Sequence, residues 1–178
     1  MATYEDFIQA IREDEEYIKL KKIVREEREK MKLDENREEA LQLMGTRPSR
    51  NISAKKQFSA RAVMESMSFD MATRSRLTEL RVRAKLHADI LDDACGALGH
   101  HIRVAYGDEL KKHCTTVDAR RSFISKLNQS AEETLAKVDS LIDMLDQCIT
   151  DIDKTSFHLS KMAELIMFID SNKGSRNV

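Results

Sequence analysis

A strict seven-residue repeat of apolar side chains dominates the last third of the sequence. The repeated positions are Ile124, Ala131, Val138, Leu145, Ile152, Leu159 and Ile166. An apolar residue at every seventh position returns to the same face of a helix, so the repeat predicts one continuous helix with a seam for other helices. A second seam is formed by Leu127, Leu141, Cys148 and Met162, and Leu135, Ile142 and Ile149 widen the stripe. This width indicates more than one partner helix.

A second long helix is predicted upstream, because apolar residues recur at three- and four-residue spacing from Leu77 to Ala105. The stretch from Tyr106 to Thr116 lacks this period and is expected to be a loop, with Thr115 or Thr116 capping the next helix. A connection of about ten residues folds two helices back on each other. The fold class predicted is therefore all-α, built on a long antiparallel helical hairpin, and the low content of Gly (5) and Pro (1) agrees with it.

The wide stripe is expected to leave an apolar edge that a second copy of the chain would cover. The sequence therefore predicts a coiled-coil-like homo-oligomer. The residues assigned to its interface are Ile124, Val138, Leu145, Ile152, Leu159 and Ile166.

The first part of the chain predicts a separate, highly charged amphipathic helix over residues 1–44. Gly45 and Pro48 are expected to end it, because Gly favours helix termination and Pro forbids continuation. A basic linker with a short helix is expected over residues 45–72, followed by the hairpin over residues 73–178.

Sequence motifs of common enzyme classes are absent. The chain has no P-loop, no dinucleotide-binding glycine motif, no H-E-x-x-H and no G-x-S-x-G. Adjacent histidines such as His100 and His101 point about 100° apart on a helix, so a shared metal site is not expected there. The three cysteines form no C-x-x-C pair and no apolar run is long enough to span a bilayer. A cytoplasmic protein without enzymatic activity, cofactor, metal or membrane contact is therefore expected.

Charge is segregated along the chain although the net charge is only −1. Residues 45–85 carry ten basic and three acidic groups, whereas both flanking segments are acidic. A local basic field of this kind attracts phosphate groups or an acidic protein surface. The alternative is that the basic block pairs with the acidic flanks of its own chain or of a neighbouring subunit.

The basic block predicts a nucleic-acid interface. Its densest part, residues 74–85, places cations seven residues apart on a helix, so that they form two parallel ridges able to contact a phosphate backbone. The residues assigned to this contact are Arg74, Arg76, Arg81, Arg83 and Lys85, with Arg47, Arg50, Lys55, Lys56 and Arg61 extending the track. Phe58 and Phe69 are the only aromatics in the block, so the predicted binding is mainly electrostatic.

The segment from Leu145 to Leu159, continuing to Phe168, resembles the end of phage UvsY-type recombination mediators. These proteins also close on a long helix with an aromatic about halfway and an M-x-F-like ending. The resemblance covers about thirty residues at general helical positions and includes no catalytic motif. It implies an oligomeric helical protein of the bacterial host cytoplasm that binds single-stranded DNA. It further implies a recombinase or a single-strand-binding protein as partner.

Two functions of different classes are therefore predicted as competitors. The first is an oligomeric accessory protein that binds nucleic acid, with single-stranded DNA favoured. The second is a helical structural or adaptor protein, such as a virion component, whose basic block docks on an acidic partner. The clustering of Arg with Ser and Thr favours the first, and the scarcity of aromatics favours the second.

Overall fold

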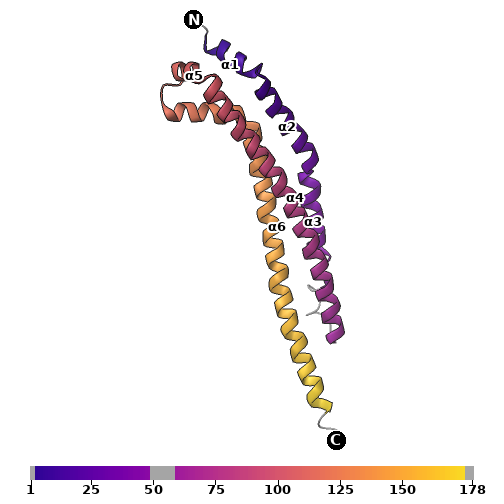
Figure 1. Ribbon diagram of the computed structural model, residues 1–178. Helices are drawn as coiled ribbons and strands as arrows, with labels where there is room; N and C mark the ends of the chain where they lie inside the picture. The colour runs from indigo at the N-terminus through magenta and orange to yellow at the C-terminus, as the bar shows by residue number, and fades with distance from the viewer. Residues whose placement is uncertain (1–2, 49–58, 175–178) are drawn as a thin grey trace. The chain divides into compact units, whose positions relative to one another are not determined.

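A computed structural model describes residues 3–48 and 59–174 of the chain. Within these ranges the chain consists of helices and short connections, with no strand. The helices are α1 (Tyr4–Arg12), α2 (Glu15–Met31), α3 (Leu33–Gly45), α4 (Ala60–Ala105), α5 (Gly107–His113) and α6 (Val117–Gly174) (Figure 1). The predicted all-α fold class is confirmed.

The longest helix, α6, spans 58 residues and contains the whole seven-residue repeat. It starts where the sequence predicts, because the Thr116 hydroxyl accepts a hydrogen bond from the Ala119 amide at 3.1 Å. This bond satisfies one of the amide groups that have no partner inside the first turn of a helix. The capping residue is therefore Thr116 rather than Thr115.

The second long helix, α4, spans 46 residues and begins well before Leu77, where the sequence pattern becomes clear. The predicted boundary between residues 45–72 and 73–178 therefore falls inside one continuous helix. Its buried face carries Ser66, Asp70 and Thr73 in this early part. These residues have the three- and four-residue spacing of a buried helix face. Because they are polar, apolar periodicity does not reveal that face.

The connection between the long helices has the predicted bounds, but it contains a short helix where a loop was expected. The first of them ends at Ala105, and the seven residues of α5 follow at once. Leu110 anchors this short helix because its side chain is only 2% exposed. One buried leucine in seven residues is too weak a periodic signal to predict a helix.

The charged N-terminal segment forms three helices rather than one. The first interruption separates α1 from α2. There the Asp14 side chain accepts a hydrogen bond from the Glu16 amide at 2.9 Å and caps α2. Lys32 makes the second interruption, because its φ of 42° is left-handed and ends α2 before α3 begins. The third helix ends at Gly45, as predicted, and the Thr46 hydroxyl donates to the Gln42 carbonyl at 3.1 Å.

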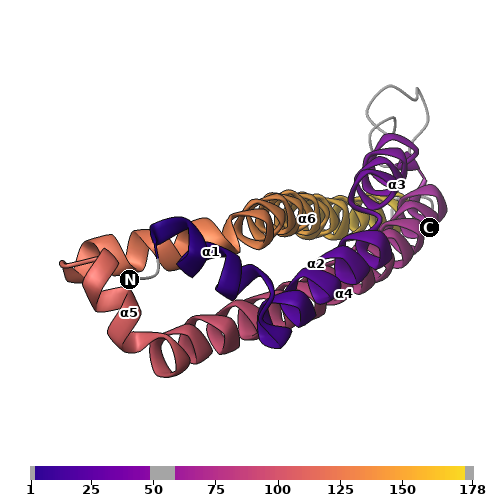
Figure 2. The same cartoon turned by 90° about the horizontal axis from the view of Figure 1, so that it is seen from above.

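The chain divides into two compact units, and the division cuts both long helices. Unit 1 comprises Met1–Leu33 and Arg83–Leu141, and unit 2 comprises Asp34–Val82 and Ile142–Val178. In each unit a segment of α4 lies antiparallel to a segment of α6, and N-terminal helices complete the packing (Figures 1 and 2).

Unit 1 buries one face of α1 and α2 against the long helices. Phe7 is 1% exposed and its ring stacks on those of Phe123 and His113, with centroids 5.5 and 5.2 Å away. Farther along, the Glu27 carboxylate is hydrogen-bonded to the imidazole of His87 at 2.6 Å. The N-terminal segment therefore belongs to the core of this unit.

Asp14 makes a second polar contact between the N-terminal helices and α4. Its Oδ2 accepts hydrogen bonds from the Tyr106 hydroxyl at 2.9 Å and from His101 Nε2 at 3.0 Å. Burial opposes ionisation of Asp14, but these bonds and that from the Glu16 amide outweigh it and lower the carboxyl pKa from its ordinary 3.8. Burial and the same contact raise the pKa of Tyr106 to about 12.

Replacing Asp14 by asparagine should lower the free energy of unfolding by about 1 to 2 kcal/mol at pH 7, because hydrogen bonds to a charged acceptor are lost. The cap of α2 is kept, since asparagine is also a good capping residue. The folded-state pKa of Asp14 is depressed, so its contribution is full above its unfolded pKa and disappears as the pH falls through the folded value. Urea unfolding should show a smaller stability difference between wild type and Asp14→Asn at pH 3 than at pH 7. The control Asp108→Asn, at a position 92% exposed, should change the free energy of unfolding little at either pH.

In the described ranges no helix has the length of apolar sequence that a membrane crossing needs.

Candidate anion-binding site

The predicted basic ridges on α4 are largely neutralised by carboxylates of the same chain. Arg74 forms two hydrogen bonds to Asp153 of α6, at 2.6 and 3.1 Å, which lower the pKa of that carboxyl. Arg76 forms an equivalent pair with Glu39 of α3, at 2.6 and 3.1 Å. Arg81 contacts Asp146 of α6. These three arginines therefore join the helices of unit 2, as the intramolecular alternative anticipated.

Arg47 is removed from the predicted track altogether, because its side chain is 1% exposed. The guanidinium donates to both oxygens of Asp70, at 2.9 and 3.0 Å, and to Asp151 Oδ2 at 2.6 Å. The hydrogen bonds to Asp70 and Asp151 raise the arginine pKa against the effect of burial. Arg47 cannot contact a nucleic acid from this position, which corrects its assignment as a binding residue.

The remaining described residues of the track are exposed on α4. Arg61 is exposed and pairs with Glu65 one turn away at 2.9 Å, and Arg83 and Lys85 are exposed on α4. The other predicted contacts, Arg50, Lys55, Lys56 and Phe58, lie outside the described residues.

The residues assigned to the oligomer interface lie in the core of the chain instead. Ile124, Val138, Leu145, Ile152 and Leu159 are each at most 6% exposed, and Ile166 is partly buried. Helix α4 and the N-terminal helices occupy the width of the stripe that was assigned to a second chain. The chain's own helices therefore account for this seam, and any association between copies needs another surface.

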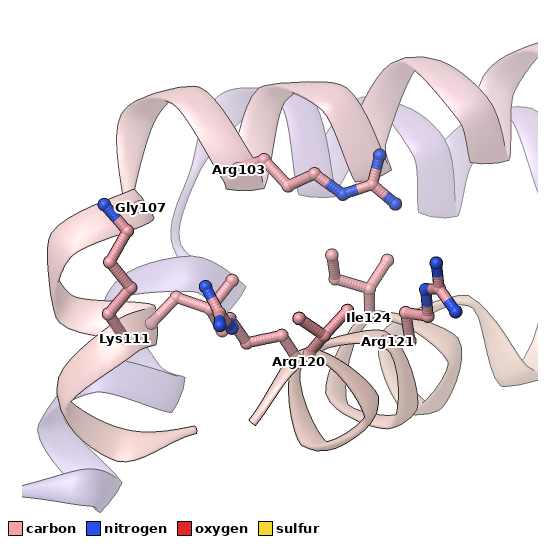
Figure 3. Close-up of a pocket in the computed structure, with 8 residues that line it drawn as sticks. Arg103, Gly107, Lys111, Arg120, Arg121 and Ile124 are labelled. Atoms are coloured by element: carbon pink, nitrogen blue, oxygen red, sulfur yellow. The ribbon is translucent and has the colours of Figure 1, made fainter. Parts of the chain in front are cut away.

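A cationic pocket lies in unit 1 where α4, α5 and the start of α6 meet. Its volume is about 440 Å³, and its eight lining residues include four cations and no carboxylate. Arg103 extends from α4, Lys111 from α5, and Arg120 and Arg121 from the first turns of α6 (Figure 3). The lining is completed by Gly107, Leu110, Val117 and Ile124.

The cations of this pocket have weaker partners than those of the track. Lys111 is 3.3 Å from Asp108 and Arg121 is 3.9 Å from Asp118, and both of these carboxylates are more than 90% exposed. Arg120 donates to the Thr116 carbonyl at 3.2 Å. Exposed ion pairs at these distances contribute little to stability. Another anion can therefore readily replace the carboxylate in such a pair.

The backbone adds to the positive potential of the pocket. Val117 is the first residue of α6, so the positive end of a 58-residue helix dipole lies beside Arg120 and Arg121. The floor is apolar, with Leu110 and Ile124 exposed by 2% and 6%. Such a pocket can hold an anionic group that is attached to an apolar body.

The amino-acid sequence does not predict this pocket, because its cations come from three separate helices. Its only local signals were the adjacent pairs Lys111-Lys112 and Arg120-Arg121, which stand in a segment of acidic net charge. In the described part of the chain no group of three or more His, Cys, Asp or Glu side chains is placed to hold a metal ion. Comparisons with protein-family models, with curated proteins and with solved structures found no match for this chain.

Proposed function

We propose that this protein is a non-enzymatic accessory factor that binds the backbone of a nucleic acid through the cationic pocket of unit 1. The observation that carries the proposal is that Arg103, Lys111, Arg120 and Arg121 line one pocket whose lining includes no carboxylate. Guanidinium and ammonium groups bind phosphate, and displacement of counterions from the nucleic acid favours association. The principal contact is thus moved from residues 74–85 to this pocket.

Single-stranded DNA is the preferred ligand in this proposal. The pocket combines cations with an apolar floor, and Val117 at its edge is 56% exposed. A flexible single strand can place a phosphate among the cations and an unstacked base on the apolar side chains, whereas a duplex keeps its bases stacked. The finer role of loading a recombinase onto strands coated by a single-strand-binding protein is a proposal that rests on the UvsY-type resemblance.

The proposal is tested by titrating a fluorescent single-stranded oligonucleotide at several salt concentrations. A triple variant, Arg103→Gln, Arg120→Gln and Arg121→Gln, should bind weakly, and its slope of log affinity against log salt should be smaller by about 2, because each lost phosphate contact removes about 0.7. The matched control replaces Lys126, Lys137 and Lys154 by glutamine. These lysines are exposed on α6 outside the pocket lining and give the same change of charge.

The control should retain both the wild-type affinity and the wild-type slope. Absence of binding by the wild type at low salt, or an equal loss in both triple variants, would contradict a specific pocket.

The second candidate function is that of a helical adaptor. It is favoured by the pairing of Arg74, Arg76 and Arg81 with carboxylates of their own chain, which leaves less positive charge for a nucleic acid. In this case the same oligonucleotide titration would show no salt-dependent binding.

A further inference from the structure

The outer face of α6 near its end carries large apolar residues that the fold leaves exposed. Phe157 is 62% exposed and Phe168 is 65% exposed. The inner face of the same segment is already used, because Leu159 and Ala163 pack against Val63 of α4. Unit 2 therefore presents a second apolar face on α6, distinct from the seam that holds the hairpin together.

Two charged residues lie between the phenylalanines on the same face. At 100° per residue, Phe157, Lys161, Glu164 and Phe168 fall within about 60° of one another around the helix. Lys161 and Glu164 are 57% and 60% exposed and form an ion pair at 2.9 Å. The outer face thus reads Phe, Lys, Glu, Phe with spacings of four, three and four residues.

This pattern is complementary to itself when one helix is turned end to end. In a two-fold antiparallel pairing of two such helices, Phe157 of one copy lies opposite Phe168 of the other. Lys161 then lies opposite Glu164, and each contact occurs twice, as a closed two-fold interface requires. Opposite charges at the centre and aromatic pairs at both ends select this one alignment.

We propose that a second copy of this chain docks on the outer face of α6 in this antiparallel arrangement. The inference is independent of nucleic-acid binding and replaces the buried heptad seam as the association surface. The contact is about three helical turns long and offers less than the roughly 800 Å² per partner of a standard interface. Association in the micromolar range is therefore expected.

Charge reversal provides the test, with sedimentation velocity of the full chain from 1 to 200 µM as the measurement. Wild type should shift from monomer to dimer. Lys161→Glu places Glu opposite Glu, and Glu164→Lys places Lys opposite Lys, so each single variant should dimerise about tenfold more weakly. The double variant restores opposite charges and should dimerise as wild type does.

Mixing the two single variants distinguishes the effect of charges that face each other between copies from the effect of the ion pair within each chain. In the mixed dimer every Glu again faces a Lys, so the mixture should dimerise about tenfold more tightly than either variant does alone. Lys137→Glu, an exposed change on α6 in unit 1, should leave dimerisation unaltered. Circular dichroism should be the same for all variants.

A wild type that stays monomeric at 200 µM would overturn the proposal. Failure of the mixed variants to associate would also overturn it, because the charges would then not face each other across the two-fold axis. Neither outcome bears on oligonucleotide binding by the pocket.

Discussion

Replacing Ile152 by aspartate should unfold unit 2. The side chain of Ile152 is 0% exposed, and truncating a buried isoleucine to alanine already costs about 2 to 5 kcal/mol. A carboxylate at this position adds the cost of placing an unpaired charge in an apolar core, which amounts to several kcal/mol. The total approaches the whole stability of an ordinary domain, about 5 to 15 kcal/mol.

The measurement is circular dichroism during urea unfolding, with Thr150→Asp as the control. Thr150 is exposed two residues away on α6 and receives the same new charge, so its substitution should change stability by less than about 0.5 kcal/mol. The effect of Ile152→Asp should be the same at all protein concentrations at which the chain is monomeric, because the seam is filled by the chain's own helices. A concentration-dependent loss would instead return this residue to an interface between copies.

Replacing Arg47 by methionine should destabilise unit 2 by about 3 to 5 kcal/mol. Asp70 is 0% exposed and receives two hydrogen bonds from this guanidinium, so the substitution takes a cation and two hydrogen bonds away from a buried carboxylate. Asp151 is 56% exposed and is solvated more easily after the change. The large effect therefore comes from Asp70.

The double variant Arg47→Met and Asp70→Leu provides the comparison. Replacing both charges by apolar side chains removes the buried carboxylate together with the arginine, so the double variant should be more stable than Arg47→Met alone. Urea unfolding of the wild type, both single variants and the double variant gives the coupling free energy. Additive losses would mean that the two residues act separately, contrary to their bidentate contact.

Apolar periodicity was sufficient to predict α6 and the later part of α4, because the side chains that a helix buries recur at regular spacing in the sequence. The short connection between the two helices predicted their antiparallel pairing. The early part of α4 was missed because the buried positions at Ser66, Asp70 and Thr73 are polar. The break at Lys32 depends on one left-handed residue that no sequence signal marks.

The site was harder to predict than the fold, because charge along a sequence says nothing about which opposite charges meet in space. Arg47 is bound by residues 23 and 104 positions away. Arg74 and Asp153 are separated by 79 residues. The pocket cations, conversely, lie in a segment of the sequence with acidic net charge. They come close together only because three helices meet at the pocket.

The buried arginine of unit 2 also determines which of several alignments the two long helices adopt. A seam built on a seven-residue repeat can slide by seven residues and still match apolar to apolar. The partly exposed ion pairs do not prevent a slide in one direction. Asp139, Asp146 and Asp153 are seven residues apart, so Arg74 would then face Asp146 and Arg81 would face Asp139. Asp151 has no such repeat: Met144 and His158 stand seven residues to either side. A shifted hairpin would leave Arg47 without its second carboxylate, so this contact favours the observed alignment of the two helices in unit 2.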